Sequence, residues 1–215
     1  MGMEAVLAQA TPAQLQEFEQ NPPLAYQYVT GDPGEGDPLA RIQAMVRANF
    51  KRMRIPPHMR EAVENQLRPM MGETRKGPQL VRAEFELDKK EFSLGKDWHV
   101  LHYALNRTAE GGEGPLAFAV FGDQAFQEMD GVDYGPVRYL TPEQVQNVSD
   151  ALQEVDPSSL LSKLNYVDAK KKRIYLDHTL DDLDNWSYLP ELFMEFRNFY
   201  SDAAASGNGM LMKII

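Results

Sequence analysis

The sequence predicts an α+β fold: a single mixed domain with a small central sheet packed by helices, plus an inserted basic helical hairpin. Strand-like stretches are scattered among helical ones without regular strand–helix–strand alternation. A chain of 215 residues is long enough to bury one substantial core. A turn-rich stretch, "TGDPGEGDP", precedes a basic helical region. We therefore expect one domain over 1–215, with 31–85 as a helical insertion.

The first predicted element is a short strand in "MEAVLAQA". Thr11 and Pro12 are typical of an N-cap and a first helical turn, which predicts a helix from about 12 to 20. "NPPLAYQYV" predicts a second short helix. The apolar ending "MLMKII" predicts a final strand, which we expect to neighbour the first one in the sheet.

The insertion begins with an amphipathic helix from residue 39 that carries Arg47, Lys51 and Arg54 along one flank. Two prolines stop it, and a second helix is expected from about 58 to 70. The alternation in "LVRAEFELD" then predicts a strand. The favoured interpretation of this hairpin is that its apolar face packs inward and its cations are solvated. Docking on an acidic partner and binding to anionic lipid are the alternatives, and the three cations are our candidate partner-binding residues.

The second half contains the predicted centre of the sheet and two long helices. The apolar run "LAFAVFG" is our candidate for the central strand, and "DYGPVRYL" predicts a turn and a short strand. "TPEQVQNVSDALQEV" predicts a helix capped by Thr141. A last helix is predicted from an apolar stripe that should face the core, formed by Trp186, Leu189, Phe193, Phe196 and Tyr200.

Composition restricts the function classes. The chain has no cysteine, which excludes disulfides, thiolate zinc sites and cysteine nucleophiles. The start "MGMEAVLAQA" has no basic n-region or long apolar h-region, so we expect no signal segment, and we expect no membrane span. We expect a cytoplasmic protein that binds neither membranes nor nucleic acid, since its net charge is −10. Residues 41–90 nevertheless hold 12 of the 22 basic and 6 of the 32 acidic residues. This asymmetry points either to a surface with a partner or to two parts of the protein that attract each other.

The segment "DWHVLHYALN" predicts a helix with His99 and His102 near one flank. Imidazoles three residues apart can converge on zinc, but a site needs at least one more protein ligand, such as His178 or an acid of 177–184. Acid–base catalysis is the second possibility, and a packed, hydrogen-bonded pair is the third. We favour the packed pair, and we expect no metal site and no cofactor.

Arg138 lies between Tyr134 and Tyr139 beside Gly135 and Pro136. It could present its guanidinium to an anionic ligand, although an ion pair with a carboxylate is the favoured interpretation. The glycine-rich stretches lack the features of a phosphate-binding loop, and no serine lies in a nucleophile elbow. A small-ligand pocket, if present, would combine His99, His102, Tyr134 and Arg138.

Four segments resemble the YfbM-like family of bacterial proteins of unknown function: "MGMEAVLAQATPAQLQEFEQNP", "DWHVLHYALN" with "GGEGPLAFAVFG", "DYGPVRYLTPEQV", and "FRNFYSDAAASGNGMLMKI". The resemblance covers both ends and about the last three-fifths of the chain, whereas residues 31 to about 85 depart from it. It implies a compact bacterial α+β domain and supplies no activity.

These observations favour a non-catalytic, cytoplasmic protein-binding protein. An immunity or antitoxin-type protein that docks a bacterial toxin is a narrower form of this hypothesis. The competing hypothesis is an enzyme or small-ligand-binding protein that uses the four-residue pocket, with zinc as its first candidate metal.

Overall fold

The computed structural model describes residues 3–31, 89–126, 134–175 and 186–215, which form an α+β domain. Its antiparallel sheet has five strands in the order β2-β1-β5-β4-β3. The strands are β1 (Ala5–Ala10), β2 (Glu91–Gly95), β3 (Gln124–Ala125), β4 (Arg138–Leu140) and β5 (Gly209–Ile214). The predicted fold class is therefore confirmed. The predicted basic hairpin and the strand expected over 80–88 lie outside the described residues.

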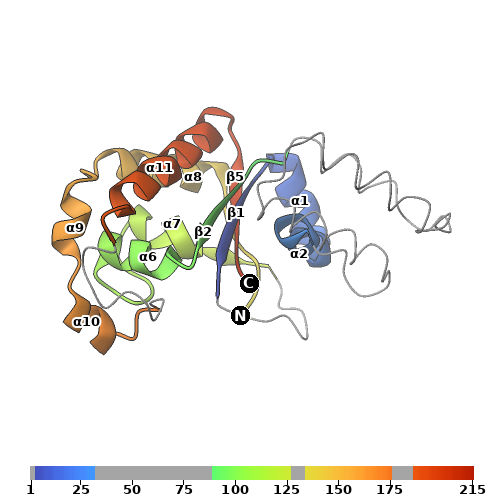
Figure 1. Cartoon of the computed structure of the whole chain (residues 1–215). Coiled ribbons are helices and arrows are strands. Elements are labelled where there is room, and N and C mark those ends of the chain that lie inside the picture. Colours follow the sequence, from blue (N-terminus) through green and yellow to red (C-terminus); the bar gives the residue numbers. More distant parts are fainter. Residues whose placement is uncertain (1–2, 32–88, 127–133, 176–185) are drawn as a thin grey trace, which may run out of the picture.

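Helices cover both faces of the sheet (Figure 1). The helices α1 and α2 lie on one face, while α6, α7, α8 and α11 lie on the other, with α9 and α10 at the outer end. The helical elements are α1 (Pro12–Gln20), α2 (Pro22–Thr30), α6 (Trp98–Asn106), the 3₁₀ turn η2 (Pro115–Ala117), α7 (Phe118–Phe121), α8 (Pro142–Gln153), α9 (Ser159–Lys163), α10 (Tyr166–Lys171) and α11 (Leu189–Ala205).

The strands β1 and β5 form the middle of the sheet, as expected from the two ends of the sequence. They pair antiparallel from Ala5 opposite Ile214 to Ala10 opposite Gly209. Alternate side chains of a strand point to opposite faces. Leu7 accordingly packs in the large core under α6, α8 and α11, whereas Ala8 packs in the smaller core under α1 and α2.

Two threonines begin helices in the predicted way. The side chains of Thr11 and Thr141 accept hydrogen bonds from the backbone N–H groups of Gln14 and Gln144, and each glutamine side chain bonds back to the threonine backbone N–H. These capping boxes satisfy amide groups that a helix leaves unpaired at its start. The predicted helices at 12–20 and 141–155 are thus confirmed, with α8 ending at Gln153.

The expected central strand over "LAFAVFG" is wrong, because these residues form η2 and α7. Pro115 sits at the first position of the 3₁₀ turn, where its fixed φ suits a helical start. Gly122 ends α7 with φ +70°. A short apolar run that is buried on several sides has no period that distinguishes helix from strand. The strand at the centre of the sheet is β5.

The aromatic stripe of the last helix faces the core as predicted. Leu189, Phe193, Phe196 and Tyr200 on α11 are fully buried. Trp186 is also buried, but it precedes α11, which begins at Leu189. The strand β2 and the short helices α9 and α10 were not predicted.

Candidate functional site

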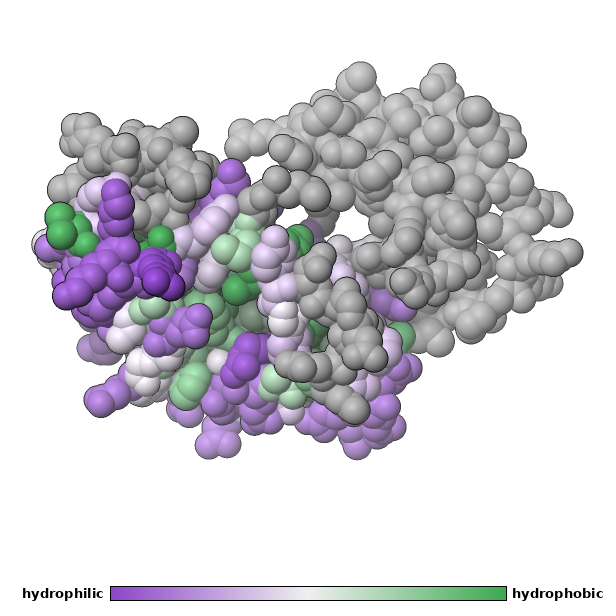
Figure 2. Space-filling model, turned by 90° about the horizontal axis from the view of Figure 1, so that it is seen from below, coloured by the Kyte–Doolittle hydropathy of each residue, from purple (hydrophilic) through white to green (hydrophobic). Residues whose placement is uncertain are grey.

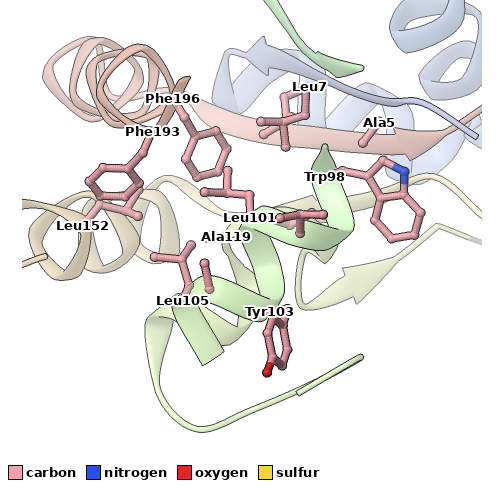
Figure 3. Packing of buried hydrophobic residues seen from close by; sticks show 14 of the residues in the cluster. Ala5, Leu7, Trp98, Leu101, Tyr103, Leu105, Ala119, Leu152, Phe193 and Phe196 are labelled. Atoms are coloured by element: carbon pink, nitrogen blue, oxygen red, sulfur yellow. The ribbon is translucent and has the colours of Figure 1, made fainter. Parts of the chain in front are cut away.

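The two histidines lie on α6, whose residues from Trp98 to Leu105 are all buried. Figure 3 shows that side chains of this helix point to different sides. Leu101 points toward Phe196 of α11 and Trp98 lies beside β1, whereas Tyr103 points to the opposite side. The helices α7 and α9 and the turn η2 also pack against α6. Both imidazoles are therefore interior groups.

Both ring nitrogens of His99 bond to backbone groups. The N–H of Tyr175 donates to Nδ1 at 2.8 Å, so the ring hydrogen lies on Nε2, which donates to the carbonyl of Ala109 at 2.7 Å. The ring also stacks on Trp98, with centroids 4.5 Å apart and planes 2° from parallel. Burial lowers the pKa of His99, although the bond to Ala109 opposes this shift. His99 is therefore held as one neutral tautomer.

His102 is fully buried and has less hydrogen bonding than His99. Its ring contacts Phe121 edge-on at 4.6 Å, and its Nδ1 lies 3.4 Å from Nδ2 of Asn106. Its Nε2 has no hydrogen-bond partner among the described residues. Burial, with a smaller contribution from His99, lowers the pKa of His102 to about 4, although the nearby backbone of Gly111 opposes this shift. The imidazole is therefore neutral at pH 7.

The guanidinium of Arg138 is hydrogen-bonded to a backbone carbonyl. Its Nη2 donates to the carbonyl of Asp123 at 2.7 Å, while the Asp123 carboxylate accepts a 2.6 Å hydrogen bond from Nε2 of Gln144. The Nε of Arg138 is buried and has no hydrogen-bond partner within the described ranges. Tyr134 is 57% exposed and has a left-handed backbone, with φ +59°.

The structure brings together two of the four predicted pocket residues. His99 and His102 both contact the ring of Phe121. Among the described residues, no hydrogen bond or ring contact joins this pair to Tyr134 or Arg138. Ligand binding by the four residues thus stays a prediction.

A shallow hollow of about 280 Å³ lies between η2 and α8. It is lined by Gly114, Pro115, Phe118, Gln144, Asn147 and Val148. None of the four predicted pocket residues lines it. The Gln144 side chain is already bonded to Thr141 and Asp123, so the hollow offers a ligand mainly apolar contact.

The part of the chain that the structure describes holds no group of three His, Cys, Asp or Glu side chains able to bind a metal ion. His178 and the acidic residues of 177–184 lie outside the described ranges, as do Arg47, Lys51 and Arg54. None of the described helices is long and apolar enough to cross a bilayer.

A charged cluster around Tyr103 was missed by the sequence analysis. The Tyr103 hydroxyl donates to Oδ2 of Asp168 at 2.6 Å, and Nζ of Lys172 lies 2.5 Å from the same oxygen. The cations of Arg107 and Lys172 lie 5.0 and 5.9 Å from the centroid of the Tyr103 ring. The i,i+4 spacing of Asp168 and Lys172 signals their pairing, but no local pattern links them to α6.

The domain of unknown function DUF1877 matches residues 1–213 of the chain. The chain belongs to the DUF1877 family. A solved structure with the same fold is that of YfbM, a protein of unknown function from Escherichia coli. The two chains are 14% identical, 99% of each is covered, and the TM-score is 0.52.

The family and the solved structure confirm the YfbM-like resemblance, and at this identity the structural likeness shows the fold alone. No curated protein matches the DUF1877 chain.

Proposed function

We propose that this DUF1877 protein is a non-catalytic protein-binding protein. The observation that supports this function best is the bonding of His99. Its Nδ1 lone pair accepts from Tyr175, and its Nε2 hydrogen is donated to Ala109. Binding a metal or exchanging a proton would require breaking one of these bonds. His99 is thus bonded within the fold, and we assign the recognition of a partner protein to the surface of the molecule.

The partner-binding region that we propose is the basic helical hairpin predicted within residues 31–85, with Arg47, Lys51 and Arg54 as contacts. Residues 41–90 carry a net charge of +6 within a chain of net charge −10. Such asymmetry favours an acidic protein partner over nucleic acid or membrane, because the whole chain repels extended polyanions. The narrower form of the proposal is a cytoplasmic immunity or antitoxin-type protein that docks a toxin.

A second candidate function is small-ligand or zinc binding. Two buried nitrogens, Nε2 of His102 and Nε of Arg138, favour it, because neither has a hydrogen-bond partner among the residues that the structure describes and buried polar groups are ordinarily satisfied. It has less support than protein binding. Both ring nitrogens of His99 are hydrogen-bonded, and Tyr134 is 57% exposed.

Affinity capture followed by reconstitution tests the proposed function. The full chain is used as bait, and each captured protein is purified and titrated against it by calorimetry. We expect a defined stoichiometry and about tenfold weaker binding when Arg47, Lys51 and Arg54 are changed to Glu, since like charges then face the acidic partner. Lys90→Glu, at an exposed residue outside the predicted hairpin, is the matched control.

Metal analysis of the purified chain tests the second candidate. The wild type is compared with His99→Ala and His102→Ala after incubation with zinc and removal of excess metal. Stoichiometric zinc that both substitutions abolish, together with the absence of any partner that reconstitutes, would overturn the proposed function.

A further inference from the structure

The outer surface of α10 is both basic and apolar. Lys170, Lys171, Lys172 and Arg173 are consecutive and exposed. Val167, one turn earlier, is 76% exposed, which is more than any other large hydrophobic side chain among the described residues. Seen from below in Figure 2, the end of the molecule where α10 lies is largely hydrophilic, with a small hydrophobic area at its rim.

Within the described part of the chain, the cations on this surface outnumber the carboxylates paired with them. Asp168 pairs with Lys172, and Arg107 lies next to this pair across the Tyr103 ring. We define the α10 surface as Arg107, Val167, Asp168, Lys170, Lys171, Lys172 and Arg173. Its five cations and one carboxylate give a net charge of +4, whereas the whole chain carries −10. The α10 surface is thus positively charged, whereas the protein as a whole is negatively charged.

Two of these cations occupy backbone positions that ordinarily favour glycine. Arg107 follows α6 with φ +61°, and Arg173 follows α10 with φ +56°. The N–H groups of Arg173 and Ile174 bond to the carbonyls of Lys170 and Ala169, which is the pattern of a Schellman C-cap. A basic residue complements the helix dipole from any position in the last turn, including positions with an ordinary helical φ, so the dipole does not require arginine at a left-handed position. Helix capping alone therefore does not explain arginine at both positions.

We propose that the α10 surface docks a short acidic segment of a protein partner, with an apolar side chain of that segment covering Val167. This inference rests on the proposed function and specifies the chemistry of the partner. Carboxylates suit both the lysines and the arginine forks. A short segment meets only the local positive field, because charges are screened beyond about 8 Å at physiological salt. A nucleic acid or an anionic bilayer extends past this surface and meets the acidic remainder of the chain.

Fluorescence anisotropy with a defined probe tests the inference. The probe is a labelled twelve-residue peptide of Glu with two central Leu, and its control replaces every Glu with Gln. We expect the acidic probe to bind and the amide probe not to bind. Lys171→Glu should weaken binding about tenfold, whereas Lys90→Glu should change it less than about twofold. Val167→Ser, which keeps every charge, should weaken it by about threefold.

Several results would overturn the inference. The first is that the acidic probe does not bind, and the second is that Lys171→Glu and Lys90→Glu lose the same affinity for it. The third is that a single-stranded RNA or phosphatidylserine vesicles bind more tightly than the acidic probe. Circular dichroism of each variant verifies folding, and all three substituted side chains are exposed. A reconstituted partner whose affinity falls with the Arg47, Lys51 and Arg54 changes but not with Lys171→Glu would leave the proposed function standing while removing the α10 surface.

Discussion

The backbone N–H of Tyr175 donates a 2.8 Å hydrogen bond to Nδ1 of His99, joining positions 76 residues apart in the sequence. The same imidazole bonds to Ala109 through its other nitrogen. One side chain therefore connects α6 to the segment after it and to the segment after α10. Its predicted role is structural, and this can be tested by measuring stability.

Replacing His99 should destabilise the fold. His99→Ala removes a ring stacked on Trp98 and leaves the Tyr175 N–H and the Ala109 carbonyl without their partner, so we expect a loss of about 3 kcal/mol in the free energy of unfolding. Urea denaturation measures this loss. Tyr134→Ala, at a 57% exposed position, is the control and should cost less than about 0.5 kcal/mol. Equal costs for the two variants would show that the interior role is wrong.

The neutral state of His102 predicts acid sensitivity. Its pKa is about 4 in the folded chain and 6.5 when unperturbed, so between these values the unfolded chain binds more protons. The contribution of His102 is complete above about pH 6.5 and is lost as pH falls toward 4, amounting to about 3 kcal/mol. Urea denaturation from about pH 7.5 to about pH 4.5 measures the slope. His102→Gln should reduce this slope, and an unchanged slope would contradict the assignment.

The phenol of Tyr103 should ionise at a higher pH than an ordinary tyrosine. Burial, and then its hydrogen bond to Asp168, raise the pKa of Tyr103 to about 12. Since the neutral phenol is favoured in the folded chain, its contribution to stability is complete below pH 10 and is lost as pH rises toward 12. The difference between the ultraviolet titrations of the wild type and Tyr103→Phe isolates this phenol. A difference curve centred near pH 10 would contradict the prediction.

Gly122 is required by both its backbone and its surroundings. Its φ is +70°, and a Cβ there would lie 2.9 Å from the Met212 sulfur and 3.2 Å from the Tyr139 nitrogen. We expect Gly122→Ala to lower the free energy of unfolding by about 3 kcal/mol. Gly207 has a similar φ of +64° with nothing within 4 Å, so Gly207→Ala should lose only about 1 kcal/mol. Thermal unfolding of both variants separates crowding from backbone strain, and equal losses would exclude crowding.

Elements with local signals were predictable from the sequence. Thr11 and Thr141 with their glutamines mark two helix starts, and the stripe containing Phe193 and Phe196 marks a third helix. The run over η2 and α7 was assigned to a strand because an apolar segment buried on several sides carries no period. Pro115 and Gly122 at its boundaries were the available evidence for a helix.

The surroundings of the histidines were only partly predictable. Helical spacing placed His99 and His102 on one flank, and their burial agrees with the favoured packed pair. Their neighbours depend on tertiary contacts: Phe121 comes from α7, and Tyr175 follows α10. Arg138 was expected to pair with a carboxylate, yet its hydrogen bond is to the backbone carbonyl of Asp123.

The pairing of β1 with β5 has a consequence for how the polypeptide acquires its shape. Residues 5 and 214 face each other, so the middle of the sheet depends on contacts of very high sequence separation. Closing so large a loop costs entropy before any ladder bond compensates it. During synthesis β1 can pair with β2 once Glu91–Gly95 has emerged, but its pairing with β5 must wait until nearly all of the described sequence has left the ribosome. We therefore expect slow, late acquisition of the native state, with the apolar face of β1 exposed to chaperones in the interval.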